Sequence, residues 1–364
     1  MFKRLNKLIV PQLFTINSCP QLLTMKKRTS LKDIAQKVGV STALVSYVLN
    51  NQKEGRISKE VAQKIKAAAL ELNYRPNQVA KSLKTNKTFT IGLIVADIAN
   101  PFSSLLARII EDEAEKINYT VIFGSSDEEA EKSQKLIDVF LNRQVDGLII
   151  ALAENTATQL QYLQEQEIPF VLIDRYFPGI KASYVAIDNF QAAASAVRHL
   201  IQNNFKRIGL VTFKTSLFHL QERQRGYTAT LKEYGLPVKG NWIKQVGILN
   251  TQKEIETAIQ ELLALPEPVE AILFASNILS TQGLKYINTL PIKVPDDLAI
   301  TSFDESDASY LFYAPITHIR QPLQEMGRQA IRILVENMNN SQSIREINLT
   351  AELVVGKSTS RTRS

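Results

Sequence analysis

The chain has 364 residues, of which 45% are hydrophobic and 22% charged, with one cysteine and three histidines. That length is too great for one ordinary domain, and the composition excludes a disordered, collagen-like or coiled-coil protein. The single cysteine excludes a disulfide framework and fits a reducing cytoplasm, and with so few histidines a zinc-type metal site is excluded as well. No apolar run approaches the ~18 residues of a transmembrane helix, so no membrane partner is expected.

The net charge of +7 is distributed unevenly along the chain. Residues 25–87 contain 14 lysines and arginines against four acidic residues, a balance of +10, whereas residues 88–364 carry −6. A basic segment of this size that also shows the periodicity of folded helices favours a polyanionic partner, and nucleic acid is the first choice.

Residues 1–24 have a basic start and a short apolar stretch that is broken by Pro11. They are a poor signal peptide, because the apolar region is weak and no clear small-residue cleavage site follows it. Met25 is followed at once by three basic residues and then by strong helix signals. We therefore expect residues 1–24 to be an over-extended reading of the gene or a disordered arm outside the fold.

Residues 30–73 predict three short helices with recognisable ends. Ser30 begins a capping-box pattern, Gly39 ends the first helix, and Ser41 and Ser58 cap the second and third. Two helices joined by a tight turn with glycine indicate a helix-turn-helix, whose second helix enters the major groove of DNA. Small and polar side chains on its outward face can approach base edges closely, and they are Thr42, Ala43, Ser46, Tyr47 and Asn50. A plain three-helix bundle is the alternative, against which the basic charge argues.

From Thr90 onwards, short apolar strands alternate with helices in two successive series. Strands are predicted at 91–96, 120–123, 147–152, 170–173, 208–213, 271–274 and 298–303, and helices at 102–117, 129–142, 156–165, 190–203, 221–234, 252–264 and 278–288. Continuous apolar strands between helices predict parallel sheets covered on both faces, and two such series predict two Rossmann-like α/β subdomains with a cleft between them.

The sequence offers little evidence of catalysis. It lacks the G-x-S-x-G nucleophile elbow, the Walker phosphate loop and the G-x-G-x-x-G dinucleotide fingerprint. His199 and His318 have no nucleophile motif beside them. We therefore expect no enzyme activity, no cofactor and no metal.

Five segments together resemble the lactose-repressor (LacI/GalR) family of transcriptional regulators. They are Leu-Lys-Asp-Ile-Ala at 31–35, Val-Gly-Val-Ser at 38–41, Val-Ser-Tyr-Val-Leu-Asn at 45–50, Tyr-Arg-Pro-Asn at 74–77 and Ala-Lys-Ser-Leu at 80–83. The resemblance extends from about residue 30 to 360 and implies an effector-binding core of periplasmic-binding-protein type. The implied division is a DNA-binding head at 25–75, a hinge helix and linker at 76–88, and a core at 89–360, with a first lobe at 89–187 and 318–345 and a second lobe at 188–316 and 346–360.

The resemblance also implies which residues contact DNA. Thr42, Ala43 and Tyr47 occupy base-reading positions, and the positions that contact phosphates are Ser41, Ser46, Asn50 and Ser58. Asn77 is placed at the DNA as well. Leu83 matches a hinge leucine that wedges between base pairs in the minor groove, where an apolar wedge unstacks a step and bends the duplex. A helix of about eight residues is too short to be stable alone, so the hinge helix is expected to fold only against DNA and a partner hinge.

Effector contacts are implied in the same way at Phe102, Asp174, Asp188, Arg223, Ser276, Asn277, Asp304 and Gln321. An arginine and an aspartate suit a polyol, because both form bidentate hydrogen bonds to vicinal hydroxyls. An interlobe salt bridge is the alternative for Asp174 and Arg175. The family usually has Asn-Asp where Ser276-Asn277 stand here, and residues 214–220 are unusually apolar, so an atypical, larger or less polar ligand is expected.

The sequence thus predicts a cytoplasmic, sequence-specific transcriptional repressor. It should act as a homodimer on a pseudo-palindromic DNA operator, because two identical heads read two half-sites. A small-molecule effector, a sugar or sugar derivative, would bind the cleft and change operator affinity, and induction and co-repression are equally compatible with the sequence. The alternatives are a solute-binding protein of a sugar transporter, an enzyme on an α/β scaffold, and an effector-binding core controlled by a protein partner.

Overall fold

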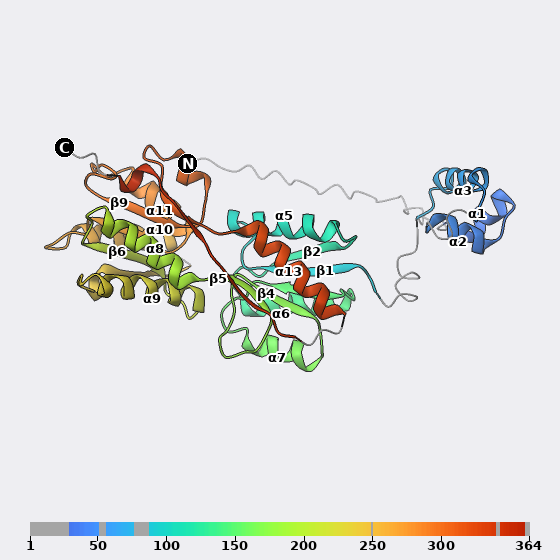
Figure 1. Cartoon of the computed structure of the whole chain (residues 1–364), viewed down its shortest axis with the longest axis horizontal. Coiled ribbons are helices and arrows are strands. Elements are labelled where there is room, and N and C mark those ends of the chain that lie inside the picture. Colours follow the sequence, from blue (N-terminus) through green and yellow to red (C-terminus); the bar gives the residue numbers. More distant parts are fainter. Residues whose placement is uncertain (1–28, 51–55, 76–86, 249, 340–342, 361–364) are drawn as a thin grey trace, which may run out of the picture. The chain divides into compact units, whose positions relative to one another are not determined.

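The structure is a computed structural model that describes residues 29–50, 56–75, 87–248, 250–339 and 343–360 (Figure 1). Contacts between residues divide the chain into two compact units, 1–80 and 81–364. The boundary between the units falls inside the segment 76–88 that the sequence predicts as a hinge and linker. Among the described residues, no helix combines the length and the apolar character needed to cross a membrane.

The described part of the first unit consists of three helices. They are α1 (Leu31–Val38), α2 (Thr42–Leu49) and α3 (Lys59–Glu71). Ser30 and Asp33 form the predicted capping box, in which the Ser30 N–H donates to the Asp33 carboxylate at 2.7 Å and the Ser30 hydroxyl accepts from the Asp33 N–H. Gly39 ends α1 at a φ of 76°, which a glycine adopts without steric cost.

The three helices hold one another in place around a small core. Ile34, Val45 and Ile65, one from each helix, are completely buried. The Thr29 hydroxyl donates to the Leu72 carbonyl at 2.8 Å and so ties the start of the unit to the end of α3. Helices of eight residues are unstable in isolation, so the contacts between the helices supply the stability of this unit.

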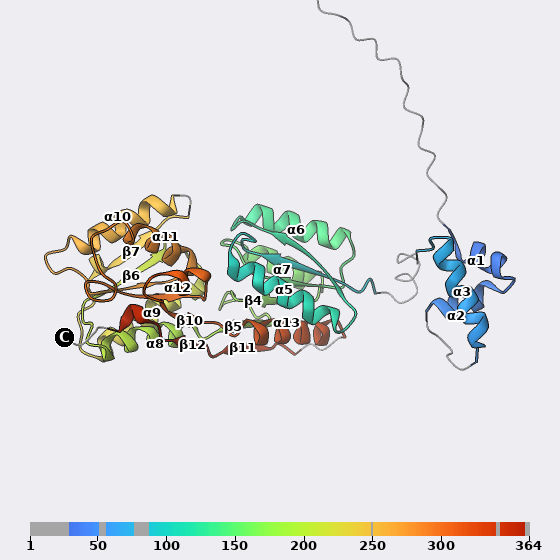
Figure 2. The same cartoon turned by 90° about the horizontal axis from the view of Figure 1, so that it is seen from above.

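The first lobe of the second unit is built on a six-stranded sheet whose pairs are all parallel. In the spatial order β11-β5-β4-β3-β1-β2, its strands are β11 (Glu346–Leu349), β5 (Tyr184–Ile187), β4 (Phe170–Ile173), β3 (Gly147–Ile150), β1 (Thr90–Val95) and β2 (Thr120–Ser125). Helices α5 (Pro101–Glu115) and α13 (Leu323–Met338) cover one face, and α6 (Ala130–Asn142) and α7 (Ala157–Glu165) cover the other (Figure 2).

The second lobe repeats this arrangement. In the order β12-β10-β9-β8-β6-β7, its strands are β12 (Glu352–Val354), β10 (Thr317–Arg320), β9 (Ala299–Phe303), β8 (Ala271–Phe274), β6 (Ile208–Phe213) and β7 (Ile243–Val246). Only the edge strand β12 runs antiparallel to its neighbour. Helices α8 (Asn189–Gln202) and α9 (Phe218–Glu233) cover one face, and α10 (Thr251–Leu263) and α11 (Asn277–Ile287) the other (Figure 2). Three short helices complete the lobe: α12 (Asp307–Leu311), η1 (Gly240–Trp242) and η2 (Lys357–Thr359).

Two of the boundaries predicted inside the core are wrong by a few residues. Residues 318–320 belong to β10, which pairs with β9 and β12 in the second sheet, so the first lobe does not resume at 318. Residues 346–349 form β11, which pairs with β5 in the first sheet, so the second lobe does not resume at 346. Both strands are short, and the sheet that a short strand joins depends on its hydrogen-bonded neighbour, which the local sequence does not reveal.

The two helices α8 and α9 approach each other closely at Gly226. A Cβ atom at that position would lie 2.3 Å from the backbone oxygen of Phe190, closer than any side chain tolerates. The absence of a side chain at Gly226 therefore sets the distance between these helices. Because Arg223 lies one turn earlier on α9, this close packing also helps to fix where its guanidinium lies.

Candidate functional site

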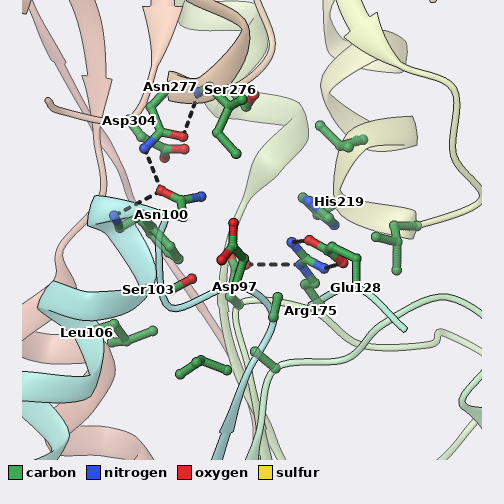
Figure 3. A pocket seen from close by; sticks show the side chains of 18 of the residues that line it. Asp97, Asn100, Ser103, Leu106, Glu128, Arg175, His219, Ser276, Asn277 and Asp304 are labelled. Carbon is green, nitrogen blue, oxygen red and sulfur yellow. Dashed lines mark hydrogen bonds and ion pairs between the residues drawn. The ribbon is translucent and has the colours of Figure 1, made fainter. Parts of the chain in front are cut away.

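A cavity of about 120 Å³ lies between the two lobes of the core. The cavity lies at the carboxyl ends of the strands, which is where open parallel sheets bind ligands. The first lobe contributes residues that follow β1 and β4 and the start of α5, and the second lobe contributes α9, the start of α11 and the residue after β9. Figure 3 shows how these side chains converge from both lobes. We call this cavity the cleft.

Seven of the eight residues predicted to contact an effector line the cleft. They are Phe102, Asp174, Arg223, Ser276, Asn277, Asp304 and Gln321. Asp188 is the exception, because it is exposed and its carboxylate caps α8 by accepting from the Gln191 N–H at 2.9 Å. Its buried neighbour Asn189 does not line the cleft either, but it contacts a residue that does: its Oδ1 accepts from Arg223 Nε at 2.8 Å.

Arg223 is only 2% exposed, and several contacts fix the position of its guanidinium. Besides its bond to Asn189, it donates from Nη1 to the Ala275 carbonyl at 2.7 Å, and its guanidinium lies 4.0 Å from the centroid of the Phe303 ring. Burial lowers the pKa of Arg223, and the carboxylates of Asp304 and Asp174 oppose that shift. A guanidinium does not lose its proton in proteins, so the cleft contains a fixed, buried cation.

Asp174 and Asp304 place two buried carboxylates in the cleft. Each follows a central strand and each has a positive φ, a conformation that aspartate tolerates better than most residues. Burial raises the pKa of Asp174 above its usual value, against the opposing charges of Arg175 and Arg223. Asp304 accepts a hydrogen bond at 2.7 Å from Gln321, whose Oε1 has no partner among the described residues.

An amide pair connects the two lobes beside these carboxylates. Asn277 of α11 donates from Nδ2 to Asn100 Oδ1 at 2.7 Å, and that same oxygen accepts from the Phe102 N–H at 3.0 Å (Figure 3). Ser276 caps α11 by accepting from the Leu279 N–H at 3.3 Å. Ser276 and Asn277, which depart from the family pattern, therefore contribute a helix cap and an interlobe contact at the edge of the cleft.

Arg175 and Glu128 form a second polar cluster that was not among the predicted site residues. Arg175 donates from Nη1 and Nη2 to the Glu128 carboxylate at 2.6 and 2.8 Å, and from Nη1 to the Leu152 carbonyl at 2.9 Å. Arg175 Nε lies 3.4 Å from Asp174. All four residues belong to the first lobe, so the interlobe salt bridge considered for Asp174 and Arg175 is not what the structure contains. Glu128 follows β2 closely, and its place after a strand is the signal that could have identified it.

His219 faces the cleft from the first turn of α9. Only 7% of it is exposed, and its Nδ1 has no partner among the described residues. Burial and the charges of Arg175 and Arg223 hold its pKa well below the usual value, so the ring is neutral at physiological pH. Leu217 and Leu220 lie beside it in the lining, so the unusually apolar stretch 214–220 forms part of the cleft wall. Among the described residues, no group of acidic, histidine or cysteine side chains is arranged to hold a metal ion.

The helical unit presents the predicted DNA-contacting side chains on one face of α2. Val45 and Val48 are buried, whereas Thr42, Ala43 and Asn50 are exposed and Ser46 and Tyr47 are partly exposed. The Ser41 and Ser58 hydroxyls cap α2 and α3 by accepting from the N–H groups of Leu44 and Val61 at 3.2 and 3.3 Å. Asn77 and Leu83 lie outside the described residues.

A two-lobed α/β core with a buried polar cleft, preceded by a helix-turn-helix unit, defines a DNA-binding regulator with a binding-protein-like core. The family described as bacterial regulatory proteins, lacI family, matches residues 30–77. The family described as periplasmic binding proteins and sugar binding domain of LacI family matches residues 88–357, well over half of the chain. The chain therefore belongs to the LacI family of transcriptional regulators.

Individual relatives agree with this assignment. The chain is 32% identical to the "Probable HTH-type transcriptional regulator EndR" of Paenibacillus polymyxa, over 87% of this chain and 93% of that protein. It is 31% identical to the HTH-type transcriptional repressor CytR of Escherichia coli K12, over 85% of this chain and 89% of the relative. The crystal structure of the lac repressor dimer bound to operator and an anti-inducer superposes with a TM-score of 0.78 at 20% identity, covering 92% of this chain and 99% of that one.

Proposed function

We propose that this protein is a transcriptional repressor whose operator affinity is controlled by an uncharged carbohydrate bound in the cleft. The observation that carries the proposal is the convergence of Arg223, Asp304 and Asp174 from two lobes into one cleft, in a chain whose first unit is a helix-turn-helix. The carboxylates accept hydrogen bonds from ligand hydroxyls and the guanidinium donates them, which suits a polyol.

The charge inside the cleft argues against a phosphorylated ligand. The carboxylates that line it are Asp97, Glu128, Asp174 and Asp304, whereas the cations are Arg175 and Arg223. Arg175 already forms a bidentate ion pair with Glu128, and Arg223 is bonded to Asn189 and Ala275. With His219 neutral, the lining has an excess of negative charge that would repel a phosphate. Apolar side chains, Phe102 and Leu220 among them, can pack against the less polar face of a sugar ring.

The DNA-binding surface is the exposed face of α2. We assign base contacts to Thr42, Ala43 and Tyr47 and phosphate contacts to Ser41, Ser46, Asn50 and Ser58, with Asn77 and Leu83 acting at the hinge. A narrow helix with small side chains at its start can enter the major groove and approach base edges. A protein that binds operator DNA works where the chromosome is, so we assign this one to the cytoplasm.

A homodimer is supported by apolar side chains that the core leaves exposed. On the second lobe, Leu311 is 83% exposed, with Tyr310 and Tyr313 beside it at 50% and 60%. On the first lobe, Leu105 is 52% exposed, and it lines the same surface pocket as Tyr310. Exposed apolar clusters of this kind mark protein–protein interfaces, and a two-fold dimer presents two heads to two half-sites.

The alternatives lack comparable support. A transporter's solute-binding protein would share the core but has no use for a helix-turn-helix unit. An enzyme would need a nucleophile or an acid–base pair aimed at a common point. The carboxylates of the cleft instead have partners of their own: Arg175 for Glu128 and Asp174, Gln321 for Asp304 and the Ala99 N–H for Asp97. Control by a protein partner is the second candidate for the core, and a screen in which no small molecule binds would favour it.

The experiment that tests the function has two parts. Purified full-length protein is first used to select DNA fragments from random sequence, and their affinity is measured as salt is raised; a palindromic consensus with a steep inverse salt dependence is expected. A thermal-shift screen then compares neutral sugars and oligosaccharides with sugar phosphates and purines. A ligand at about 100 times its Kd adds roughly 2.7 kcal/mol to stability. Stabilisation by a sugar phosphate but not by its neutral parent would contradict the proposed ligand class.

A further inference from the structure

One acidic side chain of the first lobe is bonded directly to a loop of the second. Glu154 follows β3 and is half-buried. Its Oε1 accepts hydrogen bonds from the Thr215 hydroxyl, from the Ser216 backbone N–H and, at 3.1 Å, from the Ser216 hydroxyl. Thr215 and Ser216 lie between β6 and α9, so all three donors belong to the second lobe. Glu154 therefore binds across the gap between the lobes through neutral donors.

The loop that Glu154 holds is part of the cleft wall. Thr215 and Leu217 line the cleft, whereas Glu154 is not among the lining residues. The Thr215 hydroxyl accepts from the Leu217 N–H at 3.1 Å while it donates to Glu154. Leu217 is the residue that precedes α9, the helix that carries His219 and Arg223 into the cleft. The Glu154 carboxylate is thus connected, through the Thr215 hydroxyl, to the start of α9.

The other hydrogen bonds and ring contacts described across the cleft are neutral. They are the hydrogen bond between the side-chain amides of Asn277 and Asn100 and the edge-to-face contact of Phe218 with Tyr176, whose ring centroids are 5.3 Å apart. Hydrogen bonds to a charged acceptor are roughly twice as strong as neutral ones. Burial tends to raise the pKa of Glu154, but the bonds from Thr215 and Ser216 and the charge of Arg175 outweigh it and hold the pKa below its usual value. The acceptor is therefore ionised at neutral pH.

We infer that Glu154 is a positioning residue of the cleft. It fixes the 214–217 segment against the first lobe, and so it determines how closely the wall with Leu217 and His219 approaches that lobe. The consequence for ligand affinity rests on the proposed function. The effect on the position of the loop does not, because it concerns contacts made in the ligand-free chain. A failure of the positioning role is therefore distinguishable from a failure of the proposed function.

Hydrogen exchange of the full-length, ligand-free protein tests this role, because the Ser216 N–H itself donates to Glu154. In Glu154→Ala, the amides of residues 214–220 should exchange about tenfold faster, the loss expected for a hydrogen bond to a charged group. In Glu154→Gln the increase should be smaller, because an amide oxygen still accepts. The control is Glu165→Ala, an exposed glutamate at the end of α7 in the same lobe, which should change nothing.

The pattern of exchange separates positioning from general stability. Amides of β8 and β9, in the core of the second sheet, should be unaffected in all variants, and a uniform rise across the core would overturn the inference. So would unchanged exchange at 214–220 in Glu154→Ala. A double-mutant cycle with Thr215→Val adds a further check: the effects of the two substitutions on exchange at 214–220 should be less than additive, since both remove the bond between the Thr215 hydroxyl and Glu154. Additive effects would contradict the pairing. If Glu154→Ala does not fold, exchange at 214–220 is compared between Glu154→Gln and Glu165→Ala. Faster exchange in Glu154→Gln alone supports the positioning role, and equal exchange contradicts it.

Discussion

Asp174 and Asp304 occupy corresponding positions in the two lobes. Asp174 follows β4, which lies between β3 and β5, and Asp304 follows β9, which lies between β8 and β10. Their φ angles are 67° and 66°, and each is 7% exposed. The repeated fold therefore places one carboxylate from each lobe in the lining of the same cleft, where the proposed ligand would contact both lobes at once.

Asp174→Asn should stabilise the folded protein at neutral pH while weakening ligand binding. Burial raises the pKa of Asp174 above its unfolded value, so its favourable contribution is present below the unfolded pKa and is lost as pH rises through the folded pKa. Between pH 4 and pH 7 the wild-type protein therefore loses stability through this group, whereas an asparagine is neutral at every pH. Urea denaturation of both proteins at pH 4 and pH 7 measures this, and an equal difference at the two values would contradict it.

Arg223→Ala should abolish the response to ligand while operator binding in the absence of ligand is retained. The substitution removes the bonds to Asn189 and Ala275 and takes away the buried cation whose charge acts on Asp304 and Asp174, which we expect to cost about 3 kcal/mol of stability. Fluorescence anisotropy with labelled operator, with and without ligand, measures the response. Arg225→Ala is the matched control, because Arg225 lies on the same helix but is exposed and pairs with Glu222. Loss of operator binding in Arg223→Ala alone would indicate a structural role.

Sequence reasoning succeeded where the local pattern carries the physical cause. The capping serines and Gly39 delimit α1 and α2, and the apolar strands β1 and β6 are continuous in the sequence because both faces of each sheet are covered. It failed for β7 and β11, which lie at sheet edges and carry polar side chains that a loop would also carry. Asp188, which the sequence predicts to contact an effector, does not line the cleft and caps α8 instead. An aspartate that starts a helix can serve as its cap or face a ligand, and only the three-dimensional placement distinguishes these.

Asp188→Ala should lower stability without changing ligand affinity. The carboxylate caps α8 through the Gln191 N–H, and loss of such a cap costs about 1 kcal/mol. Asn189→Ala, one position along, should instead weaken ligand binding, because Asn189 orients Arg223. Chemical denaturation and ligand titration of both variants measure the two effects. If Asp188→Ala weakened ligand binding as much as Asn189→Ala does, Asp188 would belong to the ligand site.

His219 should make the stability of the core depend on pH in the weakly acidic range. Its folded pKa lies well below the unfolded value of 6.5, so its contribution to stability is complete above pH 6.5 and is lost as pH falls towards the folded pKa. His219→Gln should therefore lose less stability than the wild type between pH 7.5 and pH 5.5. His199, whose pKa burial also lowers, is unchanged in both proteins, so the difference between them isolates His219. Parallel pH profiles would show that the ring is not held neutral.

Leu83→Ala should reduce affinity for the operator far more than affinity for random DNA. Leu83 lies outside the described residues, and its role as a wedge follows from the match of the 80–83 segment to the family's hinge. Opening a base step costs a few kcal/mol, which only the wider protein surface that touches a bent, specific site can offset. Non-specific binding depends on phosphate contacts and salt, and it should be unaffected. Anisotropy titrations with operator and with scrambled duplex at two salt concentrations measure both affinities. Equal losses on the two duplexes would show that Leu83 supports the fold of the hinge and is no wedge.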